Sequence, residues 1–201
     1  MKSNQLEDYL QFISVITNLL NEHFDAQNEY IHCKEGCAHC CRDAEYPCSE
    51  LEFEFLKIGF ANLEKEIQQK IVERIIKLKE KKTQFKGDKF TYECPFLINN
   101  KCSVYDYRMI ICRTFGLSYY DYNEQSGKNE LKIPFCVLQG LNYSEVYDKE
   151  TKGFSTELFN ESGYKNEPMA YNLGVESLMN KFGKDVMGLE FGKLKTLIDW
   201  L

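Results

Sequence analysis

The cysteines of this chain constrain its structure more than any other feature. The segment HCKEGCAHCC, residues 32–41, places four cysteines within nine residues, and four more follow in a wider set. The eight are Cys33, Cys37, Cys40, Cys41, Cys94, Cys102, Cys112 and Cys136. Because zinc sites and iron–sulfur clusters are both closed by four sulfur ligands, two sets of four thiols predict metal binding. The ninth cysteine, Cys48, is expected to be a small buried residue or a spare ligand.

These cysteines are expected to be reduced thiols rather than disulfides. A chain of 201 residues can bury roughly 70% of its unfolded surface, so it does not need cross-links to stay folded. The first twenty residues carry Glu7 and Asp8 where a secretory signal would be basic or apolar, and no apolar run approaches the about 20 residues that cross a bilayer. We therefore expect a cytoplasmic protein, a compartment that keeps thiols reduced, and an odd cysteine count agrees.

The spacing of the first block tests whether one metal ion can take all four of its sulfurs. On a straight helix the four cysteines would share one face. Cys33 and Cys41 would then lie about 12 Å apart along the axis, whereas sulfurs on one zinc ion lie less than about 4 Å apart. Two alternatives stay open. Either Gly36 breaks the helix and the chain wraps one ion, or the block divides its thiolates between interleaved sites.

Hydrophobic periodicity predicts several helices. Apolar residues at three- and four-residue steps predict helices over about 6–24 and 62–78, the second capped by Asn62 and stopped at Gly87-Asp88. The capping-box sequence Ser49-Glu-Leu-Glu52 predicts another helix through about Phe60. From about residue 155 the chain is expected to be helical again. Core-facing positions expected there are Leu173, Leu178, Phe182, Phe191, Leu194, Ile198 and Leu201.

The middle of the chain is expected to be less regular. Asn99-Asn100 stands between two cysteines and predicts a short hairpin, residues 105–116 a short helix or turn, and 117–138 strand and loop with a turn at Ser126-Gly127. The expected fold class is mainly α with a small irregular or two-stranded cysteine-rich element, forming a metal-stabilised single domain. Residues 1–150 would form the cysteine-cluster domain with its N-terminal helices, and residues 151–201 a helical segment packed on it.

Charge narrows the range of partners. The net charge of −6 and the pI near 5.3 argue against a surface for nucleic acid or an anionic membrane. The one basic run, KLKEKK at residues 77–82, contains a glutamate and is typical of a solvated helix end. A metal ion or cluster is therefore the expected partner, and an unidentified protein partner stays open.

Two arginines lie beside the second cysteine set. A site closed by four thiolates carries a formal charge of −2 with zinc, so the guanidinium groups of Arg108 and Arg113 would offset that charge and donate hydrogen bonds to sulfur. Imidazole is also a zinc ligand, which keeps His32 and His39 as alternatives. Arg113 directly follows Cys112, so its placement beside the sulfurs is the better supported of the two.

These blocks resemble those of the YkgJ-type cysteine-cluster family, whose shared region is described as a zinc- or iron-chelating domain. Here the blocks read Cys33-x3-Cys37-x2-Cys40-Cys41, Cys94-Pro-Phe-Leu97, Cys102-Ser-Val-Tyr105-Asp-Tyr-Arg108-Met-Ile-Ile-Cys112-Arg113, and Cys136. The first gap is one residue longer than in many relatives, and Met109 stands where a proline is usual. The resemblance implies a metal-binding domain with the eight cysteines as candidate ligands, and it implies no reaction.

The leading hypothesis is a cytoplasmic protein whose cysteines hold zinc or iron, with an iron–sulfur cluster left open, in a structural, redox or chelating role. One alternative is a cluster-dependent enzyme. Cys33, Cys37 and Cys40 have the spacing of the radical-SAM motif, and some relatives resemble flagellin lysine methylases. Another is a zinc-shaped module that binds a protein. A classical enzyme is not expected, because the chain has three histidines, no Gly-rich phosphate loop and no HExxH.

Overall fold

The computed structural model describes residues 3–34, 36–43 and 45–201. About half of the chain is helical, and its strands pair two by two, which agrees with the predicted class in its coarse form. Contacts divide the chain into two compact units. Unit 1 comprises Met1–Lys34 and Thr114–Leu189, and unit 2 comprises Glu35–Arg113 and Glu190–Leu201. The predicted boundary near residue 150 stays a prediction. Among the described residues, no helix is both long and apolar enough to span a bilayer.

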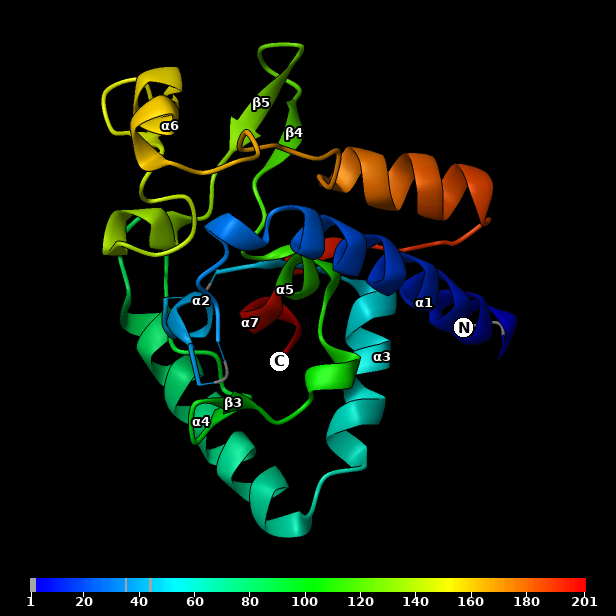
Figure 1. The fold of residues 1–201 in the computed structure, drawn as a ribbon. Helices are drawn as coiled ribbons and strands as arrows, with labels where there is room; N and C mark the ends of the chain where they lie inside the picture. The colour runs from blue at the N-terminus through cyan, green and yellow to red at the C-terminus, as the bar shows by residue number, and fades with distance from the viewer. Residues whose placement is uncertain (1–2, 35, 44) are drawn as a thin grey trace. The chain divides into compact units, whose positions relative to one another are not determined.

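Unit 1 is built around α1 (Ser3–Ala26), the long helix predicted at the N-terminus (Figure 1). The face formed by Tyr9, Phe12 and Ile16 is fully buried, as its three- and four-residue spacing requires. The other elements of unit 1 are η1 (Asn28–Tyr30), β4 (Tyr119–Asn123), β5 (Lys128–Lys132), η3 (Phe135–Gln139), β6 (Tyr147–Asp148), β7 (Gly153–Phe154), α6 (Thr156–Ser162) and the π-helical η4 (Glu176–Val186). β4 pairs with β5 across the predicted turn, and β6 pairs with β7.

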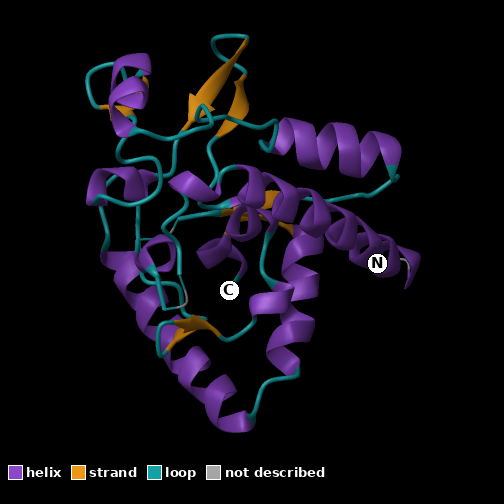
Figure 2. Cartoon of the chain, in the orientation of Figure 1, coloured by secondary structure: helices purple, strands orange, loops and turns teal. Residues whose placement is uncertain are grey.

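Unit 2 contains the helices that follow the first cysteine block. Its elements are α2 (His39–Arg42), β1 (Pro47–Ser49), α3 (Glu50–Ala61), α4 (Lys65–Gln84), β2 (Leu97–Ile98), β3 (Lys101–Cys102), η2 (Tyr105–Tyr107), α5 (Ile110–Thr114), β8 (Leu194–Thr196) and α7 (Leu197–Trp200). Figure 2 shows how short its strands are beside its helices. β2 and β3 form the predicted hairpin, with Asn99 at φ 51° and Asn100 at φ 60° in its turn. Asparagine tolerates this left-handed conformation, which explains the pair of them.

The start of α3 confirms the capping box, whereas the predicted cap of α4 is wrong. Ser49 Oγ accepts a hydrogen bond from Glu52 N, and the Glu52 carboxylate accepts one from Ser49 N. Asn62, however, ends α3, and α4 begins at Lys65 after Glu64. The reason lies in Gln68, whose side-chain amide donates to three carbonyls in the turn between the helices and holds the start of α4 two residues further on.

The last residues of the chain depart from the predicted helix. β8 runs antiparallel to β1, with Leu194 opposite Ser49, and the Leu194 side chain is 51% exposed rather than core-facing. Pairing with a strand some 145 residues away is invisible to local periodicity. The C-terminal helix is tied to this sheet by a hydrogen bond of 2.7 Å, which Trp200 Nε1 donates to the carbonyl of Cys48 in β1. Cys48 itself is fully buried in that core.

Candidate metal centre

The first cysteine block does not continue as a straight helix. Gly36 has φ +85°, a left-handed conformation that glycine adopts without strain, and the helix that follows it, α2, is only four residues long. The division into two units places Cys33 in unit 1 and the other three cysteines of the block in unit 2. Within unit 2, Cys40 and Cys41 lie on α2 with their sulfurs 3.9 Å apart.

Cys41 lies with the second cysteine set. Its carbonyl accepts a hydrogen bond of 2.7 Å from the backbone N–H of Cys94, which joins α2 to the segment leading into the hairpin. Cys102 ends β3 of that hairpin, and Cys112 lies on α5. Three segments that are far apart in sequence therefore bring thiols toward one region of unit 2.

The four thiols of this group, Cys41, Cys94, Cys102 and Cys112, influence one another electrostatically. Burial is the main cause that raises the pKa of Cys94 to about 12, and the neighbouring Cys41 and Cys102 contribute to this rise. Burial also raises the pKa of Cys112 well above its usual value, followed by the effects of Cys94, Cys41 and Cys102. Deprotonating all four thiols would concentrate negative charge in a partly desolvated environment. Only a cation or a cationic cluster could offset that charge.

Cys41 differs from the other three in the direction of its shift. A hydrogen bond from the Cys40 thiol is the main cause that lowers the pKa of Cys41 to about 7. Burial opposes this, and the positive charges of Arg108 and Arg42 add to the lowering. At neutral pH Cys41 is therefore the thiol of the group most ready to meet a metal ion as thiolate.

The structure places both predicted arginines beside this group. Burial raises the pKa of Cys102, and the positive charges of Arg108 and Arg113 oppose that rise; Arg108 also adds to the lowering of the Cys41 pKa. The Arg108 guanidinium carbon lies 3.6 Å from the centre of the Tyr105 ring, and its Nε is buried without a hydrogen-bond partner in the described structure. An orphaned N–H beside thiols fits an acceptor such as a metal-bound sulfur.

Arg113 is held more firmly than Arg108. Its Nε donates to the carbonyl of Arg108 at 3.1 Å and its Nη2 donates to the carbonyl of Asp106, and the residue is only 8% exposed. Arg108 therefore supplies positive charge from the turn that joins β3 to α5, and Arg113 supplies it from α5 while its hydrogen bonds stiffen that turn.

Sequence reasoning assigned Glu52 to a helix cap and missed its second contact. Its Oε2 accepts from the N and Oγ of Ser49 at 2.8 and 2.7 Å, and its Oε1 accepts from Ile110 N at 2.8 Å. Ile110 begins α5, the helix that carries Cys112, so a carboxylate that is 3% exposed joins α3 to the candidate centre. Burial raises the pKa of Glu52, although these hydrogen bonds and Arg113 oppose the rise.

Two predicted ligands, Cys33 and Cys136, lie in unit 1. Cys33 is exposed and lies against the side chain of Asn142, and Cys136 is buried in η3. His32 Nε2 lies 3.3 Å from the carboxylate of Glu145. Cys37, the remaining predicted ligand, is half-buried in unit 2. Residues 3–34, 36–43 and 45–201 contain no group of three or more His, Cys, Asp or Glu side chains whose spacing already fits a metal ion.

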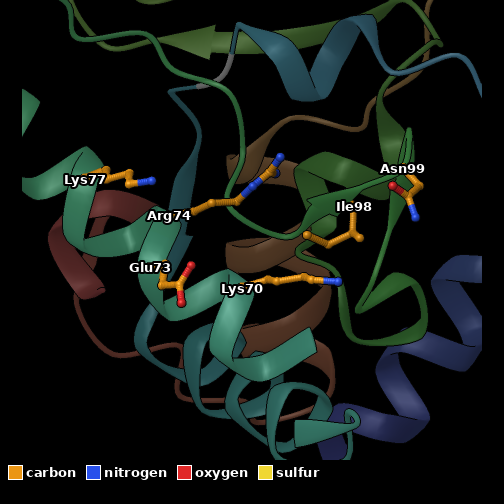
Figure 3. A pocket seen from close by; sticks show the side chains of 6 residues that line it. All are labelled: Lys70, Glu73, Arg74, Lys77, Ile98 and Asn99. Atoms are coloured by element: carbon orange, nitrogen blue, oxygen red, sulfur yellow. The ribbon is translucent and has the colours of Figure 1, made fainter. Parts of the chain in front are cut away.

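A hollow of about 320 Å³ between α4 and the β2–β3 hairpin contains no cysteine (Figure 3). It is lined by Lys70, Glu73, Arg74, Lys77, Ile98 and Asn99. Its cations are largely matched by acids, since Lys70 pairs with Glu66 at 2.6 Å and Arg74 pairs with Glu93 at 3.3 Å. The hollow is therefore neither part of the cysteine centre nor strongly charged.

Comparison with known proteins gives one match. The family model described as "CxxCxxCC: Putative zinc- or iron-chelating domain" matches residues 32–136. That range is half of the chain and contains all eight predicted ligands and both arginines. The chain has no match among the curated proteins or the solved structures that were searched.

Proposed function

Because this chain belongs to the CxxCxxCC family, we propose that it is a cytoplasmic protein whose cysteines bind zinc or iron. One observation carries the proposal: the four thiols Cys41, Cys94, Cys102 and Cys112 lie close enough to act on one another's charge. Four sulfurs are the number that closes a structural zinc site or a cubane iron–sulfur cluster. Among the described residues, no cysteine takes part in a disulfide.

The arginines support this proposal. Four thiolates around one zinc ion leave a formal charge of −2, and the guanidinium groups of Arg108 and Arg113 offset it from within unit 2. The unpartnered Arg108 Nε–H then finds an acceptor in a metal-bound sulfur. Cys33, Cys37, Cys40 and Cys136 stay in the proposed ligand set.

The role we propose first is structural. The four thiols of unit 2 come from α2, from the hairpin and its leading segment, and from α5, so one metal ion or cluster would cross-link these elements. Under this arrangement metal binding contributes directly to the free energy of folding. An iron–sulfur cluster would in addition supply electron transfer, tuned by the adjacent arginines.

Anaerobic purification with metal and sulfide analysis tests the proposal. Brown protein with equal iron and labile sulfide indicates a cluster, and colourless protein with zinc indicates a zinc site. Cys112→Ser should lower the bound metal, whereas Cys48→Ala, at a buried thiol outside the group, should leave the metal content unchanged. Wild-type protein that folds normally and retains neither metal in any preparation would refute the proposal.

A further inference from the structure

Asn142 is a fully buried polar residue that lies outside the matched family region. Its side-chain Oδ1 accepts a hydrogen bond from the backbone N–H of His32 at 2.8 Å. Its Nδ2 donates to the carbonyl of Gly116 at 2.9 Å and to Cys33 Sγ at 3.3 Å. One amide therefore connects two segments of unit 1 and contacts the sulfur of a predicted ligand.

The backbone partners determine which way the amide points. A backbone N–H can only donate and a carbonyl can only accept, so Oδ1 must face His32 and Nδ2 must face Gly116. With that orientation the second proton of Nδ2 is available to Cys33 Sγ. The Cys33 thiol also lies 3.6 Å from Oδ1, a contact in which the sulfur would donate. A metal-bound thiolate has lost its proton to solvent, so only the N–H···S bond remains in that state.

The surroundings leave the amide little freedom. Gly116 has φ +111°, and a Cβ there would lie 3.1 Å from Asn142 Nδ2 and 3.6 Å from Cys33 Sγ. On either side of Asn142 the backbone is tied: Leu141 N donates to the carbonyl of Cys136, and Tyr143 N donates to that of Tyr30. The segment that holds Asn142 is thus connected to both predicted ligands of unit 1.

We infer that Asn142 is a positioning residue that orients Cys33 for metal binding and donates an N–H···S hydrogen bond to its thiolate. This inference rests on the proposed function. The hydrogen bond withdraws charge from the sulfur and holds it in one rotamer, whereas an exposed cysteine without such a partner would sample several. Residues that hydrogen-bond to metal ligands typically change metal affinity about 10–100-fold when replaced.

A double-mutant cycle separates this role from a purely structural one. Asn142→Leu, which has a similar volume and no charge, should weaken zinc binding about 10–100-fold in a competition with a chromophoric chelator. The same substitution in a Cys33→Ala background should weaken zinc binding no further, because the sulfur it acts through is gone. Equal losses in both backgrounds would show that Asn142 only supports the fold, and the inference would fail. Asn180→Leu, at an exposed asparagine of η4, is the matched control and should change neither value.

A measurement on the wild-type chain covers the case in which the variants do not fold. Protein loaded with ¹¹³Cd should show a scalar coupling, transmitted through the hydrogen bond, between the metal and an Asn142 Nδ2 proton. Coupling from ¹¹³Cd to the β-protons of Cys41 and Cys112 without any coupling to Asn142 would overturn the inference and leave the proposed function intact. Absence of cadmium coupling to every cysteine would instead overturn the proposed function.

Discussion

Replacing Glu52 with glutamine should destabilise unit 2. The carboxyl group accepts from two backbone N–H groups, Ser49 N and Ile110 N, through different oxygens, and it keeps both oxygens when it is protonated. A glutamine has only one oxygen, so one of these buried donors must face the amide N–H₂ and lose its partner. An unsatisfied buried donor costs about 1–3 kcal/mol, so the free energy of unfolding should fall by about that amount at pH 5.

The deficit of Glu52→Gln should narrow as the pH rises. Burial raises the folded-state pKa of Glu52 above its unfolded value. A group with a raised pKa contributes its full stabilisation below the unfolded pKa and loses it as the pH rises through the folded pKa. As the pH rises from the unfolded pKa through the folded pKa of Glu52, the wild-type protein therefore loses this contribution to its free energy of unfolding. The glutamine variant does not titrate at this position, so it loses nothing from this cause.

Urea unfolding monitored by tryptophan fluorescence is a suitable assay. Trp200 is the only tryptophan, and it stacks on Phe53 with ring centres 5.4 Å apart inside unit 2. Glu54→Gln is the matched control on the same helix, because Glu54 forms a partly exposed ion pair with Lys57 and should change stability by less than about 0.5 kcal/mol. A Glu52→Gln variant as stable as this control, or a deficit that grows between pH 5 and pH 8, would refute the reasoning.

Two further predictions concern unit 2. Removing metal with a chelator should lower the free energy of unfolding, measured by Trp200 fluorescence in urea, by about 4 kcal/mol if the metal had been present at a thousandfold above its Kd. An unchanged free energy of unfolding would argue against a structural metal. Gly59→Ala on α3 should lower the free energy of unfolding by about 1–3 kcal/mol, because the new Cβ would lie 2.5 Å from Cγ of Tyr107. This cost should exceed the gain from the better helix propensity of alanine. An unchanged melting temperature in thermal unfolding would contradict the prediction.

The features that could be predicted from the sequence are those that depend on interactions within a few residues along the chain. The capping box at Ser49 and the hairpin turn at Asn99-Asn100 both follow from side chains that satisfy or tolerate the backbone within a few residues. Leu194 was misplaced for the opposite reason. Leu194 lies in β8, which forms because β1 offers an edge to pair with. The spacing of apolar residues near the C-terminus cannot predict that pairing.

Asn62 illustrates an intermediate case. Asparagine is a good N-cap, so the prediction was sound as local chemistry. Gln68 changed the outcome by donating to carbonyls of Phe60, Ala61 and Leu63 from the first turns of α4. A side chain that reaches back over the turn therefore decides where α4 begins.

The sequence by itself determined the chemistry of this protein: which side chains can bind metal, and that arginines accompany the second cysteine set. Only the tertiary structure decided which of these residues lie close to one another. It brings Cys41 to Cys94 through a backbone hydrogen bond, joins Glu52 to the helix of Cys112, and seats Asn142 against Cys33. Donor type is a property of each residue, whereas proximity between residues about 50 to 110 positions apart depends on the packing of the whole unit.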